Sequence, residues 1–279
     1  MRERPRIGVT LATVGVDAAW WLDSARRLDE AGYAAIWAWD HFVGKGDRRV
    51  PVLEATALLA AAAAVTTQVT VGSFVMNVMN REPSVLARTA GTIHELSGGR
   101  FALGIGIGGH RREHTAYGIP FPEPPERAAR LEEAISVIRA LWTGGPSTID
   151  GRFYSLRDAY AEPHREPPPP ILVGAQSRTG VGIAARAGDG WAAEMPFFEE
   201  LVSFYRESVE AAGRDVSAQR IVLGFNAGRS GEEALRDSPW VEAPEETWAE
   251  WHDRGADEVT VTARTPADIA RLLHAAERW

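Results

Sequence analysis

The sequence predicts an α/β fold in which eight strand–helix units close into a parallel (β/α)8 barrel, a TIM barrel. Short apolar runs alternate with longer helix-like segments, a pattern typical of helices surrounding a parallel sheet. The 279 residues, 45% of them hydrophobic, suffice for a barrel of roughly 250 residues with two insertions. Length alone would also allow two smaller domains. We expect a single domain over residues 1–279.

The first half of the chain is punctuated by residues that begin or end helices. Gly32 follows the first predicted helix, Pro83 begins the third, and Gly98 and Gly99 follow it. The predicted strands are residues 6–11, 35–39, 69–75 and 100–105, with helices at residues 17–31, 53–65 and 83–96.

Two insertions are predicted around the middle of the chain. Residues 110–126 are too rich in glycine and proline for regular structure, so we expect a loop after the fourth strand. Before the fifth strand, residues 147–156 predict a hairpin around Asp150-Gly151, and the prolines at 167–170 stiffen the return. The later strands are expected at residues 171–174, 190–193, 221–225 and 257–262, and the helices at residues 127–142, 179–187, 197–212, 244–254 and 266–278.

A doubly wound open sheet is the alternative fold. It would carry a dinucleotide-binding fingerprint after its first strand, where Gly8 and Gly15 have the wrong spacing. The glycine-rich run at 104–109 follows the fourth strand instead, so its likeness to a dinucleotide-binding loop is superficial.

Composition excludes several classes of protein. The chain has no cysteine, which excludes disulfide scaffolds, thiolate nucleophiles and cysteine-ligated zinc. A net charge of −8, with Lys45 as the sole lysine, argues against general nucleic-acid binding. Apolar runs such as 56–65 are too short to span a membrane, and residues 1–10 predict a strand rather than a signal peptide, so we expect a cytoplasmic protein. Any redox chemistry must come from a cofactor.

The candidate site residues follow the predicted strands, because barrels of this type bind ligands at the carboxyl ends of their strands. The side chains and loops at those ends are Asp40, His41, Ser73, Asn77, residues 104–110, residues 175–179, Glu194 and Asn226.

Residues 30–42 (EAGYAAIWAWDHF) resemble the second-strand signature of the bacterial-luciferase-like family of flavin and F420 oxidoreductases. Residues 70–73, 96–106 and 184–191 resemble the third strand of that family, its entry to the fourth strand and its approach to the sixth. Together the segments cover about residues 6–195 in the order found in the family. The resemblance implies the deazaflavin coenzyme F420 as cofactor, with FMN as the alternative.

The resemblance also implies where the cofactor lies. Its ring would cover the barrel mouth against a bulge in the third strand, with a non-proline cis peptide at Phe74–Val75. The expected cofactor-binding residues are Asp40, Ser73, Phe74, Val75, Gly106, Ile107, Gly108, Gly174, Ala175, Gln176 and Ser177, and the expected substrate pocket contains Trp39, Asn77 and Glu194.

His41 is the expected proton relay, with Asp40 orienting both the ring and the histidine. An imidazole can hold or release the proton that accompanies hydride transfer. The alternative is a histidine that merely caps the strand. Many relatives carry a proton-donating glutamate just after the fourth strand, but this sequence has Gly108-Gly109-His110 there. Either His110 replaces that acid or the proton comes from solvent.

Two further motifs each allow two interpretations. Residues 174–179 lie between a strand and a helix, where the resemblance implies a cofactor phosphate, although Ser177 or Thr179 would serve equally well as an ordinary helix cap. His110-Arg111-Arg112-Glu113-His114 matches the pattern of inverted zinc proteases. We favour the luciferase-like interpretation, which needs no metal, because the motif begins in a glycine-rich loop.

The sequence therefore predicts an F420-dependent oxidoreductase that transfers a hydride between the deazaflavin and a small organic substrate. The alternatives are an FMN-dependent monooxygenase and a flavin-binding relative without turnover, the latter because the expected glutamate is missing. The resemblance also implies a homodimer.

Overall fold

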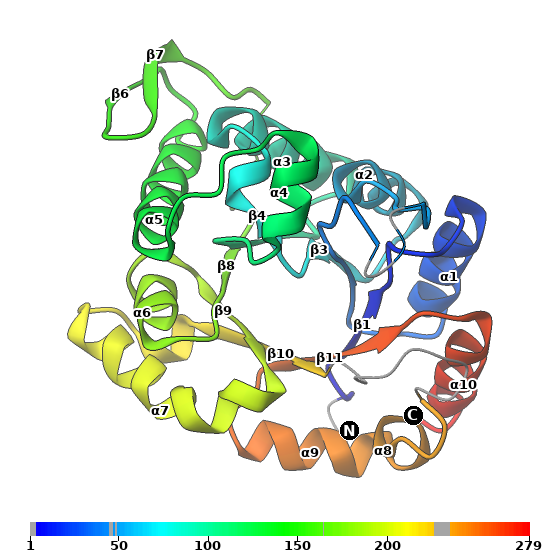
Figure 1. Cartoon of the computed structure of the whole chain (residues 1–279). Helices are drawn as coiled ribbons and strands as arrows, with labels where there is room; N and C mark the ends of the chain where they lie inside the picture. Colours follow the sequence, from blue (N-terminus) through cyan, green and yellow to red (C-terminus); the bar gives the residue numbers. More distant parts are fainter. Residues whose placement is uncertain (1–3, 45–46, 48, 164, 226–234) are drawn as a thin grey trace.

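The computed structural model describes residues 4–44, 47, 49–163, 165–225 and 235–279. Its main sheet contains β1 (Ile7–Leu11), β2 (Ala35–Ala38), β3 (Thr70–Ser73), β4 (Met76–Asn77), β5 (Phe101–Gly106), β8 (Ile171–Gly174), β9 (Gly190–Glu194), β10 (Arg220–Phe225) and β11 (Glu258–Ala263). These strands pair in the order β3-β2-β1-β11-β10-β9-β8-β5-β4, and a pairing of β3 with β5 closes the ring. Every ladder is parallel. Because β4 continues the position of β3, the described residues form the predicted eight-stranded TIM barrel (Figure 1).

Helices surround the barrel (Figure 1). They are α1 (Ala18–Glu30), α2 (Ala55–Val65), α3 (Pro83–Leu96), α4 (Arg111–Tyr117), α5 (Pro124–Leu141), α6 (Arg178–Ala187), α7 (Met195–Ala211), α8 (Pro239–Glu242), α9 (Pro244–Asp253) and α10 (Pro266–Ala276), with short 3-10 turns at Val78–Asn80 and Val216–Ala218. Prolines in the first turn begin several of them, as their fixed backbone geometry favours. In the part of the chain described here, no helix combines the length and apolarity needed to cross a membrane.

Both insertions occur where they were predicted. The second contains the antiparallel hairpin of β6 (Ser147–Asp150) and β7 (Ser155–Ala159). The first was wrongly predicted to lack regular structure, because it contains α4. Gly118 ends this helix in the left-handed conformation, so a glycine taken as a loop signal is a helix cap. The next helix, α5, begins at Pro124 rather than at residue 127.

The third strand, predicted at residues 69–75, is interrupted at the bulge that the resemblance implies. β3 ends at Ser73, the Phe74–Val75 peptide is cis as expected, and the chain then rejoins the sheet as β4. The Oγ of Ser73 donates to the carbonyl of Gly104 at 2.7 Å and accepts from the N–H of Gly104 at 3.0 Å. This side chain therefore joins β3 to β5 at the interruption.

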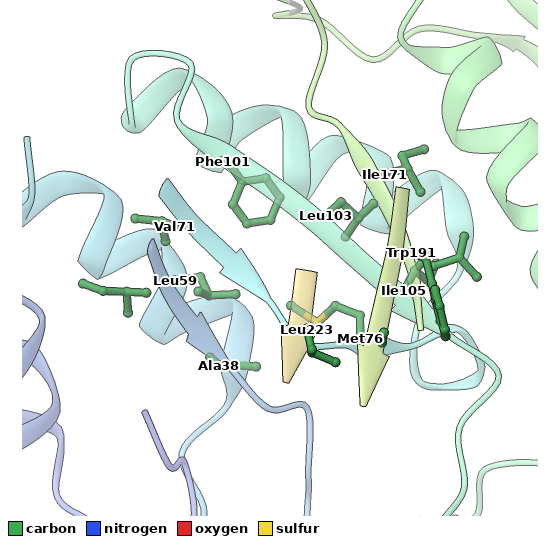
Figure 2. Close-up of a cluster of buried hydrophobic side chains, with 14 of the residues drawn as sticks. Ala38, Leu59, Val71, Met76, Phe101, Leu103, Ile105, Ile171, Trp191 and Leu223 are labelled. Atoms are coloured by element: carbon green, nitrogen blue, oxygen red, sulfur yellow. The ribbon is translucent and has the colours of Figure 1, made fainter. Parts of the chain in front are cut away.

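The larger core lies between the strands and the surrounding helices. Figure 2 shows Leu59 of α2 with Val71 of β3 and Phe101, Leu103 and Ile105 of β5 in this layer. All five residues are buried, and their side chains come from elements far apart in the sequence. Burying a side chain of this size contributes about 1.5 to 3 kcal/mol, so this layer supplies much of the stability of the barrel.

The barrel interior is a second, smaller core. Trp37, Phe74 and Val75 meet there with Ala102, Leu172, Ala192 and Val222 of the other strands. A Cβ at Gly72 would lie 2.3 Å from the Trp37 ring, and one at Gly174 would lie 2.6 Å from Val75. The absence of side chains at Gly72 and Gly174 therefore leaves the space that Trp37 and Val75 occupy.

Candidate functional site

The site is built where the carboxyl ends of the strands meet, as predicted. Trp39, Asp40 and His41 follow β2, and His110 precedes α4. Figure 1 shows α4 inside the ring of helices, near β4. The insertion after the fourth strand therefore contributes to the mouth of the barrel.

The side chain of His41 is held by Glu113 of α4. The Nδ1 of His41 lies 2.9 Å from the Oε1 of Glu113, and the carboxylate is almost fully buried while the imidazole remains 23% exposed. Burial alone would raise the pKa of Glu113, but the hydrogen bond and charge of His41, the charge of His110 and the N–H of Phe42 together lower it. Glu113 is therefore a carboxylate whose charge faces the imidazole of His41 at the mouth.

His41 lies near two other aromatic side chains. The ring centroid of His110 is 4.7 Å away with an interplanar angle of 80°, and that of Trp39 is 6.3 Å away. The guanidinium of Arg264, which follows β11, covers the Trp39 ring at 4.8 Å. The structure thus brings the predicted residues Trp39, His41 and His110 together and adds Arg264.

Asp40 does not orient His41, and that expectation was wrong. Its buried carboxylate accepts a bidentate pair of hydrogen bonds from Arg81, at 2.8 and 2.9 Å. It also accepts from the backbone N–H of Asn77 at 3.0 Å and from Asn80 at 3.1 Å. Asp40 therefore joins the end of β2 to β4 and to the turn that follows it.

Asn77 was expected in the substrate pocket, and the structure shows its amide fully engaged with protein. The Oδ1 accepts from the N–H of Met79 at 3.0 Å, while the Nδ2 lies 3.0 Å from the Oδ1 of Asn80 and 2.8 Å from the Nε2 of His114. The other ring nitrogen of His114 lies 2.9 Å from the carbonyl of Pro120. Because both nitrogens of His114 bond to protein groups, the zinc-protease interpretation of the motif loses one of its two histidine ligands. Among the described residues no group of three or more metal-ligating side chains occurs.

The loop after β5 passes close to Asn77. Gly108 has a φ of +71°, and a Cβ there would lie 2.3 Å from the Oδ1 of Asn77, so only glycine fits. Arg127 of α5 donates to the carbonyls of Ile107 and Gly108 and thereby fixes the loop. The expected cofactor residues 106–108 are thus held from both sides.

The loop after β8 leads into α6, and Ser177 caps that helix. Its Oγ accepts from the N–H of Gly180 at 3.4 Å, so the capping interpretation holds for Ser177. The N–H groups of Arg178 and Thr179 open the same helix, and helix N-termini attract anions. The guanidinium of Arg178 covers the Phe204 ring at 3.9 Å. Ala175 is fixed by its carbonyl, which accepts from the indole of Trp191 at 3.0 Å.

The remaining predicted positions are Gln176, Glu194 and Asn226. Gln176 is exposed in the loop before α6. Glu194 ends β9 at the same edge of the sheet, half-buried, and no described residue forms a hydrogen bond or ion pair with its side chain. Asn226 lies outside the described residues.

Sequence reasoning missed Glu113, His114, Arg81 and Arg264 as parts of the site. The first two lie in a segment treated as a loop, and Arg81 directly follows the 3-10 turn Val78–Asn80 after β4. One signal was present in the sequence, since Glu113 and His114 belong to the motif at residues 110–114 that matches the inverted zinc proteases. Their burial, however, depends on contacts with strands about 70 and 40 residues earlier.

A family model described as luciferase-like monooxygenase matches residues 5–279 of the chain. Among curated proteins, an F420-dependent glucose-6-phosphate dehydrogenase of Kineococcus radiotolerans is 37% identical over 200 residues, which cover 69% of this chain and 58% of that protein. The protein of the same name from Kribbella flavida is 31% identical over 267 residues, covering 92% of this chain and 79% of that one. The alignment thus spans less than two thirds of the Kineococcus relative.

Solved structures share the fold over nearly the whole chain. An F420-dependent secondary alcohol dehydrogenase in complex with an F420–acetone adduct superposes with a TM-score of 0.81 at 20% identity, covering 98% of this chain and 99% of that one. A monooxygenase from Streptomyces bottropensis superposes with a TM-score of 0.74 at 22% identity, covering 98% of both chains. These similarities confirm the predicted luciferase-like barrel.

The contact between Glu113 and His41 predicts a pH-dependent contribution to stability. Because the folded-state pKa of Glu113 is lowered, its stabilisation is fully present above the ordinary pKa of 4.5 and is lost as the pH falls through the lower folded value. We expect Glu113→Gln to lower the free energy of unfolding by about 1 to 3 kcal/mol at pH 7, and by less at pH 3. Urea unfolding over this pH range measures the difference. Glu277→Gln, at an exposed pair with His274, is the control. A difference in unfolding free energy between Glu113→Gln and the parent protein that stays constant with pH would contradict a stabilising Glu113 carboxylate.

Proposed function

Because the chain belongs to the luciferase-like monooxygenase family, we propose that it is an F420-dependent oxidoreductase that transfers a hydride between the deazaflavin coenzyme and a small organic substrate. Curated relatives at 31 to 37% identity carry the name of F420-dependent dehydrogenases, which supports the cofactor. The observation that carries the proposal is the imidazole of His41, held by a buried carboxylate at the mouth of the barrel.

The ends of β3, β5 and β8 would lie beneath the ring. A Cβ at Gly106 would lie 3.0 Å from Val75, and one at Gly174 would lie closer still, so these glycines leave room for the Val75 side chain to pack against the ends of β5 and β8. Residues 106–108 and 174–177 would hold the cofactor, and the N-terminus of α6 would receive its phosphate. When bound, F420 supplies a carrier that accepts or gives up a hydride at one carbon.

The chain supplies the proton chemistry. His41 presents its Nδ1 to Glu113, while its Nε2 bonds to no described residue and the ring remains partly exposed. In the oxidising direction this nitrogen accepts the hydroxyl proton of an alcohol as the hydride leaves the carbon, and in the reducing direction it returns that proton to the carbonyl oxygen. Glu113 stabilises the imidazolium that forms. His110 lies close enough to His41 to take the place of the expected glutamate.

We also propose a homodimer, in which α2 and α3 meet a second copy of the chain. The outward positions of α2 include the exposed Ala57 and Ala64, and the helix carries no charged residue. A helix that is apolar on all sides is normally buried. On α3, which packs against α2, Val85 is 57% exposed.

Residues 1–279 as one domain and a cytoplasmic location remain predictions.

The proposed dimer predicts that a charge on α2 dissociates it. Ala64→Glu places a carboxylate on the exposed side of α2, near its C-terminus, so we expect the mass in solution to fall from two chains to one at micromolar concentration. Sedimentation equilibrium measures this mass. Ala211→Glu, exposed on α7, is the control and should stay dimeric. A monomeric parent protein would contradict the proposal.

The cofactor assignment predicts that F420 binds at least tenfold tighter than FMN, a difference of about 1.4 kcal/mol. Parallel titrations of the cofactor-free protein, followed by quenching of its tryptophan fluorescence, measure the two dissociation constants. Equal or reversed affinities would overturn the assignment. Tighter binding of reduced FMN would instead support the monooxygenase alternative.

The proton relay predicts a specific loss of turnover in His41→Ala. We expect kcat to fall by about 10²-fold or more, while the affinity for F420 changes little. The free energy of unfolding should fall about as far as in Glu113→Gln, because both variants remove the same contact. Turnover is measured on a panel of small alcohols, carbonyl compounds and glucose 6-phosphate by the change in deazaflavin absorbance. His110→Ala tests the substitute acid in the same assay, and His274→Ala, at an exposed ion pair, is the control. A loss of only a few-fold in both active-site variants would mean that the proton comes from solvent.

A further inference from the structure

Helix α4 is attached to the barrel mainly by polar contacts. Glu113 and His114 are the two buried residues of this seven-residue helix. No residue of α4 belongs to either hydrophobic cluster of the described structure. Short helices have little stability of their own, so the position of α4 depends on the partners of these two side chains. The exposed Tyr117 adds two contacts with Phe42, a hydrogen bond from its hydroxyl to the carbonyl at 3.1 Å and a ring contact with centroids 5.1 Å apart.

We propose that His114 is a positioning residue, which locks α4 to Asn77 and thereby keeps the Glu113 carboxylate on His41. This inference rests on the proposed function only in the role that it gives to His41. The lock is a chain of hydrogen bonds that begins at Met79 and ends at Pro120, with Asn77 and His114 between them.

The direction of each bond in the lock is fixed by its neighbours. The N–H of Met79 donates to the Oδ1 of Asn77, so the Nδ2 of that amide faces His114 as a donor. The Nε2 of His114 must therefore accept, and the ring proton lies on Nδ1, where it donates to the carbonyl of Pro120. The imidazole of His114 is fully buried and bonds through both nitrogens in one tautomer. This fixes the position of α4 against Asn77, because no other orientation of the ring satisfies both partners.

The hydrogen bond between His114 and Asn77 and the contact between Glu113 and His41 both depend on the residues that follow β2. The N–H of Asn77 donates to Asp40, which precedes His41 in the chain, and His114 follows Glu113. Asp40 and His41, adjacent after β2, are thus joined to two adjacent residues of α4. His41 contacts Glu113 directly, and Asp40 is joined to His114 through Asn77. A displacement of α4 that breaks the bond of His114 also moves Glu113 away from His41.

Two substitutions separate the two bonds of His114. In His114→Gln the amide oxygen reaches the position of Nε2 and can accept from Asn77. In His114→Asn the shorter amide reaches the position of Nδ1 and can donate to Pro120, but nothing reaches Asn77. If the bond to Asn77 is the lock, the glutamine variant keeps it and the asparagine variant loses it.

The first readout needs neither cofactor nor substrate. ¹³C NMR of the Glu113 carboxyl carbon in the protein without cofactor gives its pKa, which the contact with His41 helps to lower. We expect this pKa to move up towards its ordinary value in His114→Asn and to stay low in His114→Gln. An unchanged pKa in His114→Asn, or an equal rise in both variants, would overturn the inference. Should His114→Asn fail to fold, Asn77→Ala removes the same bond from the other side and is judged by the same criteria.

The second readout tests whether His114 acts through Glu113. We expect His114→Asn to lower kcat by about tenfold in the parent protein, and by less than about twofold in a Glu113→Gln background, because residues that act as one unit are not additive. Equal effects in the two backgrounds would overturn the inference. Failure of the proposed function would appear separately, as an absence of F420 binding and turnover in the parent protein, while the NMR result would still decide the role of His114.

Discussion

The buried carboxylate of Asp40 is the interaction on which the mouth of the barrel depends. Two N–H groups of Arg81, the N–H of Asn77 and the amide of Asn80 all donate to it, and Arg81 also pairs with Glu54 at the start of α2. Removing one partner of a buried ion pair costs about 3 to 5 kcal/mol, because the other charge is left without compensation. The end of β2, the short strand β4 and the first turn of α2 are therefore fixed relative to one another, and His41 follows directly from this fixed point.

Two carboxylates at the mouth of the barrel thus have different tasks. Asp40 has its oxygens occupied by cationic and amide donors of the scaffold, so it has little capacity left for a ligand. Glu113 contacts an imidazole that is partly exposed and adjacent to a second histidine. The environment of each group, rather than its residue type, assigns one to structure and the other to the proton chemistry that we propose.

The strands, most helices and the glycine-rich strand ends could be predicted from the sequence because they depend on local patterns. Apolar runs mark β5 and β10 on both faces, and turn residues mark the helix ends. The helix α4 could not be predicted, because its two buried side chains are polar and give no apolar period. Asp40 was expected to orient His41 because the resemblance places both residues beside the ring. The actual partner, Glu113, is 72 residues away, and only the closed barrel brings it to the mouth.

The packing of the interior explains why the chemistry depends on an insertion. Trp37 and Phe74 fill the barrel, and Trp37 is held by a hydrogen bond of 3.0 Å to the buried carboxylate of Glu258, so a ligand must lie above the strands rather than within them. The strand ends around Phe74 and Val75 are glycine-rich, because Val75 packs against Gly106 and Gly174, and they leave few side chains for acid–base work. The missing group is supplied by α4, whose hold on the barrel is polar. A change of sequence in this insertion can therefore alter the proton chemistry at His41 while the seat proposed for the cofactor, made from the strands themselves, stays the same.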